Sequence, residues 1–178
     1  DGTRRTYNII YNNMYKDMSI RKATENDLSV IRQIAGLAFP AAYRDILTAG
    51  QIDYMLQWVY SLSSLQRQFR EGHVFFLAEK DGVPAGYVSV QPESGTLFHL
   101  QKLYVHPAFQ ATGVGRALFL HALSYARGCG AARVELNVNR HNSSLAFYRK
   151  MGMIVHREVD NPIGEGFYMN DYIMTIDL

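Results

Sequence analysis

Apolar residues recur in the first part of the chain with the spacing of an amphipathic helix. They are Leu28, Ile31, Ile34, Ala35 and Ala38, three or four positions apart. Pro40 is expected to end this helix, and residues 18–23 ahead of it are predicted to form a strand. Residues 50–60 and 63–70, which are rich in bulky side chains, predict a second helical region. The chain therefore begins with one predicted strand followed by helices.

The remainder of the chain predicts strands that alternate with helices. Asp81-Gly82 between two apolar runs is typical of a hairpin with a primed turn. Further strands are predicted from Leu97 and over residues 132–138 and 167–176, and further helices over residues 113–127 and 142–151. This order predicts a single-domain α/β fold with a mixed, partly antiparallel central sheet flanked by helices. We expect the domain to span residues 18–178 and residues 1–17 to form an N-terminal extension.

Composition excludes several classes of protein. Hydrophobic residues make up 48% and charged residues 19% of the 178 positions, which is typical of a globular core and not of disorder. No apolar run reaches the roughly 18 residues of a membrane span. A net charge of +2 is too small to indicate a nucleic-acid partner. Cys129 is the single cysteine, which fits a reducing compartment, and we expect a cytoplasmic location.

A glycine-bearing turn after the strand at Leu97 is suited to holding phosphate. Its residues are Gln110, Ala111, Thr112, Gly113, Val114, Gly115, Arg116 and Ala117. The first N–H groups of a helix have no internal partner and carry a partial positive charge, so anions bind there. Gly113 and Gly115 let an anion approach the backbone, and Arg116 adds a full positive charge.

Two better-known glycine motifs do not fit this turn. No Gly-Lys-Ser/Thr follows at the spacing of a Walker A loop, and Leu118 stands where a dinucleotide fingerprint needs its third glycine. The turn instead resembles Gln/Arg-x-x-Gly-x-Gly/Ala, the pyrophosphate loop of the GCN5-related N-acetyltransferases (GNAT family).

Two neighbouring segments strengthen this resemblance. Leu100 to Pro107 is similar to the family's L-x-x-L-x-V-x-P strand, and Asn142 to Met153 is similar to its N-x-x-A-x-x-(F/L)-Y-x-x-x-G-F signature. The order and spacing of the three blocks match the family. The resemblance implies acetyl-CoA as co-substrate, with Leu103, Tyr104 and Val105 pairing to the pantetheine arm through their main chain. It also implies a contact between Asn142, which is placed to cap a helix, and the cofactor.

The resemblance further implies acetyl transfer to a primary amine. Such an amine has a pKa near 10 and must lose a proton before it attacks a thioester. Tyr148 stands at the family position whose hydroxyl faces the sulfur of CoA, which makes it the candidate general acid. Its alternative role is that of a core tyrosine beside Phe147.

The general base is not fixed by the sequence. The place on the core strand where many relatives carry Glu holds His99, and the next strand offers Asn137, which cannot act as a base near neutral pH. His99 is therefore a candidate base, with a satisfied core histidine as the alternative. Glu79 and Glu93 are not supported by their spacing.

Nucleophilic and metal chemistry receive little support from the sequence. Cys129 lies between two glycines with no histidine or carboxylate at a recognisable offset, so we expect direct transfer within a ternary complex. The six histidines show no ligand spacing, and no metal is expected.

The motifs above do not identify the acceptor, because the resemblance assigns all of them to CoA. The helical region and the C-terminal strand resemble a bacterial subgroup that includes polyamine acetyltransferases of the sporulation-regulator type. Asp53, Glu93 and Asp171 are candidate anchors for a cationic amine, and a peptide N-terminus is the other acceptor considered. The chain is also compatible with a homodimer. The alternative function is a non-catalytic module that binds acyl-CoA as a sensor.

Overall fold

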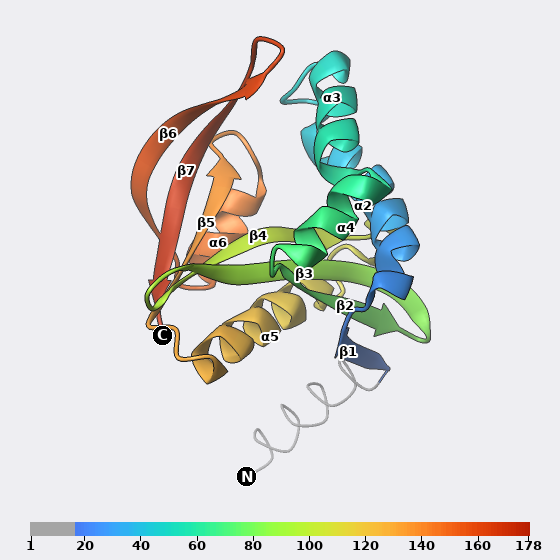
Figure 1. Ribbon diagram of the computed structural model, residues 1–178, viewed down its shortest axis with the longest axis vertical. Helices are drawn as coiled ribbons and strands as arrows, with labels where there is room; N and C mark the ends of the chain where they lie inside the picture. The colour runs from blue at the N-terminus through green and yellow to red at the C-terminus, as the bar shows by residue number, and fades with distance from the viewer. Residues whose placement is uncertain (1–16) are drawn as a thin grey trace.

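The computed structural model describes residues 17–178, which form one mixed sheet with helices on both faces (Figure 1). The predicted extension over residues 1–17 lies outside the described residues, apart from Asp17. The strands are β1 (Met18–Lys22), β2 (Val74–Lys80), β3 (Val83–Ser94), β4 (Leu97–Val105), β5 (Arg133–Asn139), β6 (Ile154–Gly164) and β7 (Phe167–Asp177). The helices are η1 (Glu25–Asp27), α2 (Leu28–Tyr43), α3 (Ala49–Tyr60), α4 (Leu62–Arg70), η2 (Pro107–Phe109), α5 (Val114–Gly128) and α6 (Ser144–Lys150).

The seven described strands are ordered β1-β2-β3-β4-β5-β7-β6. Neighbours pair antiparallel except β4 and β5, which run parallel and are joined by the crossover through α5. The expected α/β class with a partly antiparallel sheet is confirmed. None of the described helices is both long and apolar enough to cross a membrane.

Two hydrophobic cores lie on opposite faces of the sheet. The first packs α5 and α6 against the sheet around Leu118, Phe119 and Leu136, and the second packs α2, α3 and α4 around Ile31, Phe39 and other residues. Figure 1 shows α5 below the sheet and α2 to α4 above it. Both faces of β3 and β4 are therefore buried, which explains why their sequences are largely apolar.

A β-bulge in β4 changes which face its side chains occupy. The register with β3 slips between Ser89 and Val90, so that Lys102 pairs with Ser89 but Leu100 pairs with Val90. Leu100 and Leu103 consequently both face the α5 core. The bulge places Lys102 on the opposite face, beneath α4.

One prediction of secondary structure was wrong, and one strand was missed. Pro40 does not end the helix, because α2 continues to Tyr43 and buries Phe39 and Tyr43. The sequence also failed to predict β6, an edge strand with partly exposed and exposed residues along its length. The hairpin turn at Asp81-Gly82 is confirmed, since both residues have positive φ (53° and 76°).

Candidate active site

A deep cavity opens where β4 and β5 separate. The two strands pair only between Leu97–His99 and Arg133–Glu135, and beyond these residues they diverge. The cavity between them has a volume of about 730 Å³ and is walled by residues 100–105 of β4 and 136–138 of β5. The β4 backbone is left without a strand partner on this side, so its N–H and C=O groups are available to an extended chain of amides.

The glycine loop closes one end of this first cavity. Gly113 occupies the N-cap position of α5 with a φ of 87°, and this helix start has no side-chain cap and no acidic residue in its first turn. The Gln110 side chain donates a hydrogen bond to the Val105 carbonyl over 3.3 Å and ties the loop to β4. The first-turn N–H groups of α5 are therefore available to an anion at the cavity edge.

Most of the predicted site residues meet at this cavity. Those that line it are Leu103, Tyr104, Val105, Gln110, Ala111, Gly113, Val114, Gly115, Arg116, Asn142 and Tyr148. Thr112, Ala117 and His99 are not among the lining residues. The Thr112 hydroxyl instead donates to the Phe109 carbonyl and braces the loop. Lys150, which no sequence motif indicated, also lines the cavity, so two cations, Arg116 and Lys150, are among its lining residues.

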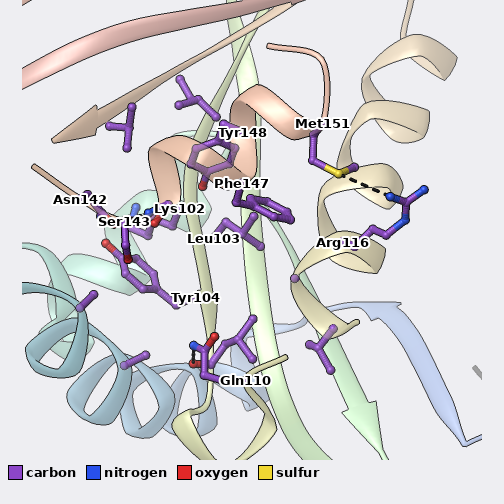
Figure 2. A pocket seen from close by; sticks show the side chains of 18 of the residues that line it. Lys102, Leu103, Tyr104, Gln110, Arg116, Asn142, Ser143, Phe147, Tyr148 and Met151 are labelled. Carbon is purple, nitrogen blue, oxygen red and sulfur yellow. Dashed lines mark hydrogen bonds between the residues drawn. The ribbon is translucent and has the colours of Figure 1, made fainter. Parts of the chain in front are cut away.

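Tyr148 reaches the first cavity from α6 (Figure 2). It is buried, and its ring packs against Phe147 and Phe119, with centroids 5.3 Å and 6.0 Å away. Burial raises the pKa of the Tyr148 phenol above its usual value, with a smaller contribution from Tyr43. The hydroxyl is therefore protonated at neutral pH and can donate a hydrogen bond or a proton.

Asn142 fixes the start of α6 to a distant helix. Its Oδ1 accepts from the backbone N–H of Ser144 over 2.8 Å, which is the predicted capping contact, although Ser143 occupies the formal N-cap position. Its Nδ2 donates to the hydroxyl of Tyr43 on α2 over 3.2 Å. The side chain is thus held from both ends at the cavity wall.

A second cavity lies between α3 and the β5–β7 strands. Its volume is about 580 Å³, and Glu93, His99, Glu135 and Asp171 are among the residues that line it. The residues that it shares with the first cavity are Tyr43, Gln101, Lys102, Tyr104 and Asn137. The two cavities therefore adjoin at β4 and β5, and a molecule in one can approach a molecule in the other.

His99 lines the second cavity next to two carboxylates. Its Nδ1 lies 3.0 Å from Oε1 of Glu135 and 4.0 Å from Oε2 of Glu93. Donor atoms of these three residues lie within 4.8 Å of one another, a spacing that a small divalent cation can bridge. No spacing in the sequence indicated this cluster, because its members come from β3, β4 and β5. The base role of His99 and the expected lack of a metal both stay predictions.

Lys102 is an unexpected buried cation beside both cavities. Its Nζ donates to Oε1 of Gln68 over 2.6 Å and lies 5.7 Å from the ring centre of Phe75. No salt bridge from Lys102 is found among residues 17–178. Burial lowers its pKa from 10.5 to about 8.

Two other residues that the sequence singled out lie away from the cavities. Cys129 is exposed at the C-terminal end of α5. Asp53 is exposed on α3 and lines neither cavity. Glu93 and Asp171, the other candidate anchors, both line the second cavity.

This fold, with a cavity where β4 and β5 separate, is that of an acetyltransferase. The model of the acetyltransferase (GNAT) family matches residues 36–153, and the chain belongs to that family. The resemblance seen in the sequence is thereby confirmed.

Relatives and solved structures agree with this assignment. The chain is 33% identical to an uncharacterized N-acetyltransferase of Mycobacterium tuberculosis over 102 residues, which is 57% of the chain and 65% of that relative. It is 28% identical to the L-methionine sulfoximine/L-methionine sulfone acetyltransferase of Salmonella typhimurium over 146 residues, which is 78% of the chain and 81% of that protein.

The fold is similar to that of the PaiA N-acetyltransferase of Thermoplasma acidophilum in complex with coenzyme A. The TM-score is 0.76 with 23% identity, and 90% of this chain and 99% of the other are covered. This likeness shows the fold, and the placement in the polyamine subgroup stays a prediction.

Proposed function

We propose that this protein transfers an acetyl group from acetyl-CoA to a primary amine. The observation that carries the proposal is the meeting of two cavities at β4 and β5. The first supplies an anion-binding helix start and a free strand edge, which suit the diphosphate and the pantetheine amides of CoA. The second supplies a space with acidic side chains for an acceptor next to the thioester.

The proposed reaction is direct transfer within a ternary complex. The amine nitrogen attacks the thioester carbonyl, the C–N bond forms, and the C–S bond breaks. Tyr148 donates a proton to the departing sulfur, and the proton that the nitrogen loses on forming the amide restores the phenol. His99 is the candidate base that the sequence supplies, with Nδ1 held by Glu135.

The acceptor is a small amine or a peptide N-terminus in this proposal. The Salmonella typhimurium relative is named for amino-acid derivatives, and the Thermoplasma acidophilum neighbour is named an N-acetyltransferase. The alternative function, an acyl-CoA sensor without catalysis, needs only the first cavity. The acidic side chains in the second cavity, Glu93, Glu135 and Asp171, favour the enzyme.

A panel of primary amines tests this function. Release of the CoA thiol from acetyl-CoA, measured with and without each amine, should show turnover that depends on one class of amine. Mass spectrometry should find the acetylated amine in equal amount to the thiol. Tight acetyl-CoA binding without thiol release for any amine or peptide would support the sensor instead.

A further inference from the structure

Asp171 is a buried acid on β7 with an unsatisfied oxygen. Only 5% of the residue is exposed, and its Oδ2 accepts from the side-chain amide of Asn137 over 3.3 Å. Its Oδ1 is buried without a hydrogen-bond partner among the described residues. A buried carboxylate oxygen without a partner is costly, so its retention calls for a ligand or a chemical role.

This acid lies beside the junction of the two cavities. Asp171 lines the second cavity, and Asn137, to which it is bonded, lines both. Tyr43 also lines both cavities, and the charge of Asp171 contributes to raising the pKa of its hydroxyl. The contacts of His99, by contrast, are with Glu93 and Glu135, which line only the second cavity.

We propose that Asp171, in place of His99, binds the ammonium group of the acceptor and takes its proton, while Asn137 holds the carboxylate in place. This inference rests on the acetyl transfer proposed above. One proton passes from the ammonium nitrogen to a carboxylate oxygen of Asp171, which leaves a neutral amine to attack the thioester. The carboxylic acid then releases that proton to solvent after the product leaves.

The surroundings of Asp171 support this proton transfer. Burial raises the pKa of the carboxyl, while Asn137, Arg140 and Asn161 act in the opposite direction. Arg140 and Tyr43 interact with it electrostatically. Tyrosines aside, the other ionisable groups that line the second cavity are two carboxylates, a histidine and two cations: Glu93, Glu135, His99, Lys102 and Arg157. The same burial lowers the pKa of a bound amine, so the two pKa values approach each other.

The rest of the second cavity indicates the chemical class of the acceptor. Apolar side chains of α3 and of the β6–β7 hairpin wall it, among them Met55, Ile163 and Met169. We therefore expect a primary amine that is cationic in solution and carries an apolar skeleton.

Asp171→Asn tests the proposal, with Asp177→Asn as the matched control on the same strand. Asp177 is exposed and pairs with Arg133 away from both cavities. At neutral pH, Asp171→Asn should lower kcat/KM for the amine by about 100-fold or more. The loss should shrink as the pH rises toward the pKa of the free amine, because solution then supplies the neutral form. Acetyl-CoA affinity and the control should be unchanged.

A merely structural role for Asp171 would not produce this rescue at high pH. A loss within about threefold, or a loss that is the same at every pH, overturns the proposal. A swapped variant, Asn137→Asp with Asp171→Asn, keeps the pair but moves the charge to β5. It should recover at least about tenfold of the lost activity if a carboxylate at this junction is what the reaction needs.

A binding experiment separates this inference from the proposed function. n-Butylammonium, titrated into the CoA-loaded protein and followed by NMR, should bind wild type and fail to bind Asp171→Asn. Binding with no thiol release for any amine would overturn the enzyme and leave Asp171 as an ammonium site. If wild type and Asp171→Asn release the thiol at the same rate, the proposed enzyme activity stands and the role of Asp171 is overturned.

Discussion

The side-chain amide of Asn142 donates a hydrogen bond to the hydroxyl of Tyr43 over 3.2 Å. This contact joins the start of α6 to the end of α2 across the first cavity, and both residues line that cavity. Because Oδ1 of the same amide caps α6 at Ser144, one side chain sets the position of the helix that carries Tyr148.

Asn142→Ala should weaken both the fold and the cofactor site. It removes a helix cap, worth about 1 kcal/mol, and takes one hydrogen-bond partner from the buried hydroxyl of Tyr43, which costs on the order of 1 kcal/mol more. We expect a lower free energy of unfolding in urea and weaker acetyl-CoA binding. Asn170→Ala, the same change at an exposed position of β7, is the control. Equal stability of the two variants would contradict the capping role.

Gly115→Val should block acetyl-CoA binding while leaving the fold intact. A Cβ at this position would meet Val105 at 3.4 Å, an ordinary contact, and it would stand beside the helix start that the diphosphate needs. We expect at least about a tenfold loss of affinity by calorimetry. Gly113 is a poorer test, because its φ of 87° makes any side chain strained.

Gly128→Ala is the matched control for this variant. Gly128 lies at the other end of α5, and a Cβ there would meet nothing within 4 Å. Unchanged acetyl-CoA affinity in a folded Gly115→Val protein would end the assignment of this loop to the diphosphate.

Cys129→Ala should retain wild-type turnover. Cys129 is exposed at the end of α5 and lines neither cavity, so it cannot carry the acetyl group between them. Steady-state kinetics with both substrates varied should give intersecting lines in both proteins. An acetylated Cys129, trapped and identified by mass spectrometry, would contradict direct transfer.

The titration of buried Lys102 should make the free energy of unfolding higher at alkaline pH than at neutral pH. Its folded pKa of about 8 lies below the ordinary 10.5, so the unfolded chain binds more protons between these values. The free energy of unfolding should therefore rise across this window, by on the order of 3 kcal/mol from this group. Urea unfolding at pH 7 and pH 10 should show a smaller rise for Lys102→Met. An identical rise in both proteins would contradict the burial of a charged Lys102.

The residues around the first cavity could be predicted because they lie in segments that are local in sequence. The glycine loop, the start of α5 and the α6 motif each occupy a few consecutive residues. Their spacing can therefore be recognised in the sequence alone. The strands over residues 97–105 and 132–138 were predicted for a similar reason, since Val134, Leu136 and Val138 alternate and all are buried.

The grouping of polar residues at the second cavity could not be predicted, because the fold assembles it from distant strands. Glu93, His99 and Asp171 were each named as candidates from the sequence, but nothing in it placed them together. Glu93, His99, Glu135 and Asp171 come from four strands, and no spacing in the sequence relates them. Lys102 was missed because strict alternation places it with Leu100, and only the bulge in β4 turns it to the other face. The edge strand β6 pairs with β7 alone and has no fully buried residue, so its side chains indicate a strand only weakly.

Steady-state kinetics of Tyr148→Phe test most directly the claim that the two cavities form one site of acetyl transfer. The change removes one hydroxyl and keeps the ring packing against Phe119 and Phe147. With an amine substrate, kcat should fall by about 100-fold or more, while acetyl-CoA affinity and the melting temperature stay close to wild type. A kcat within about threefold of wild type would contradict the account, because the phenol would then give no proton to the leaving thiolate.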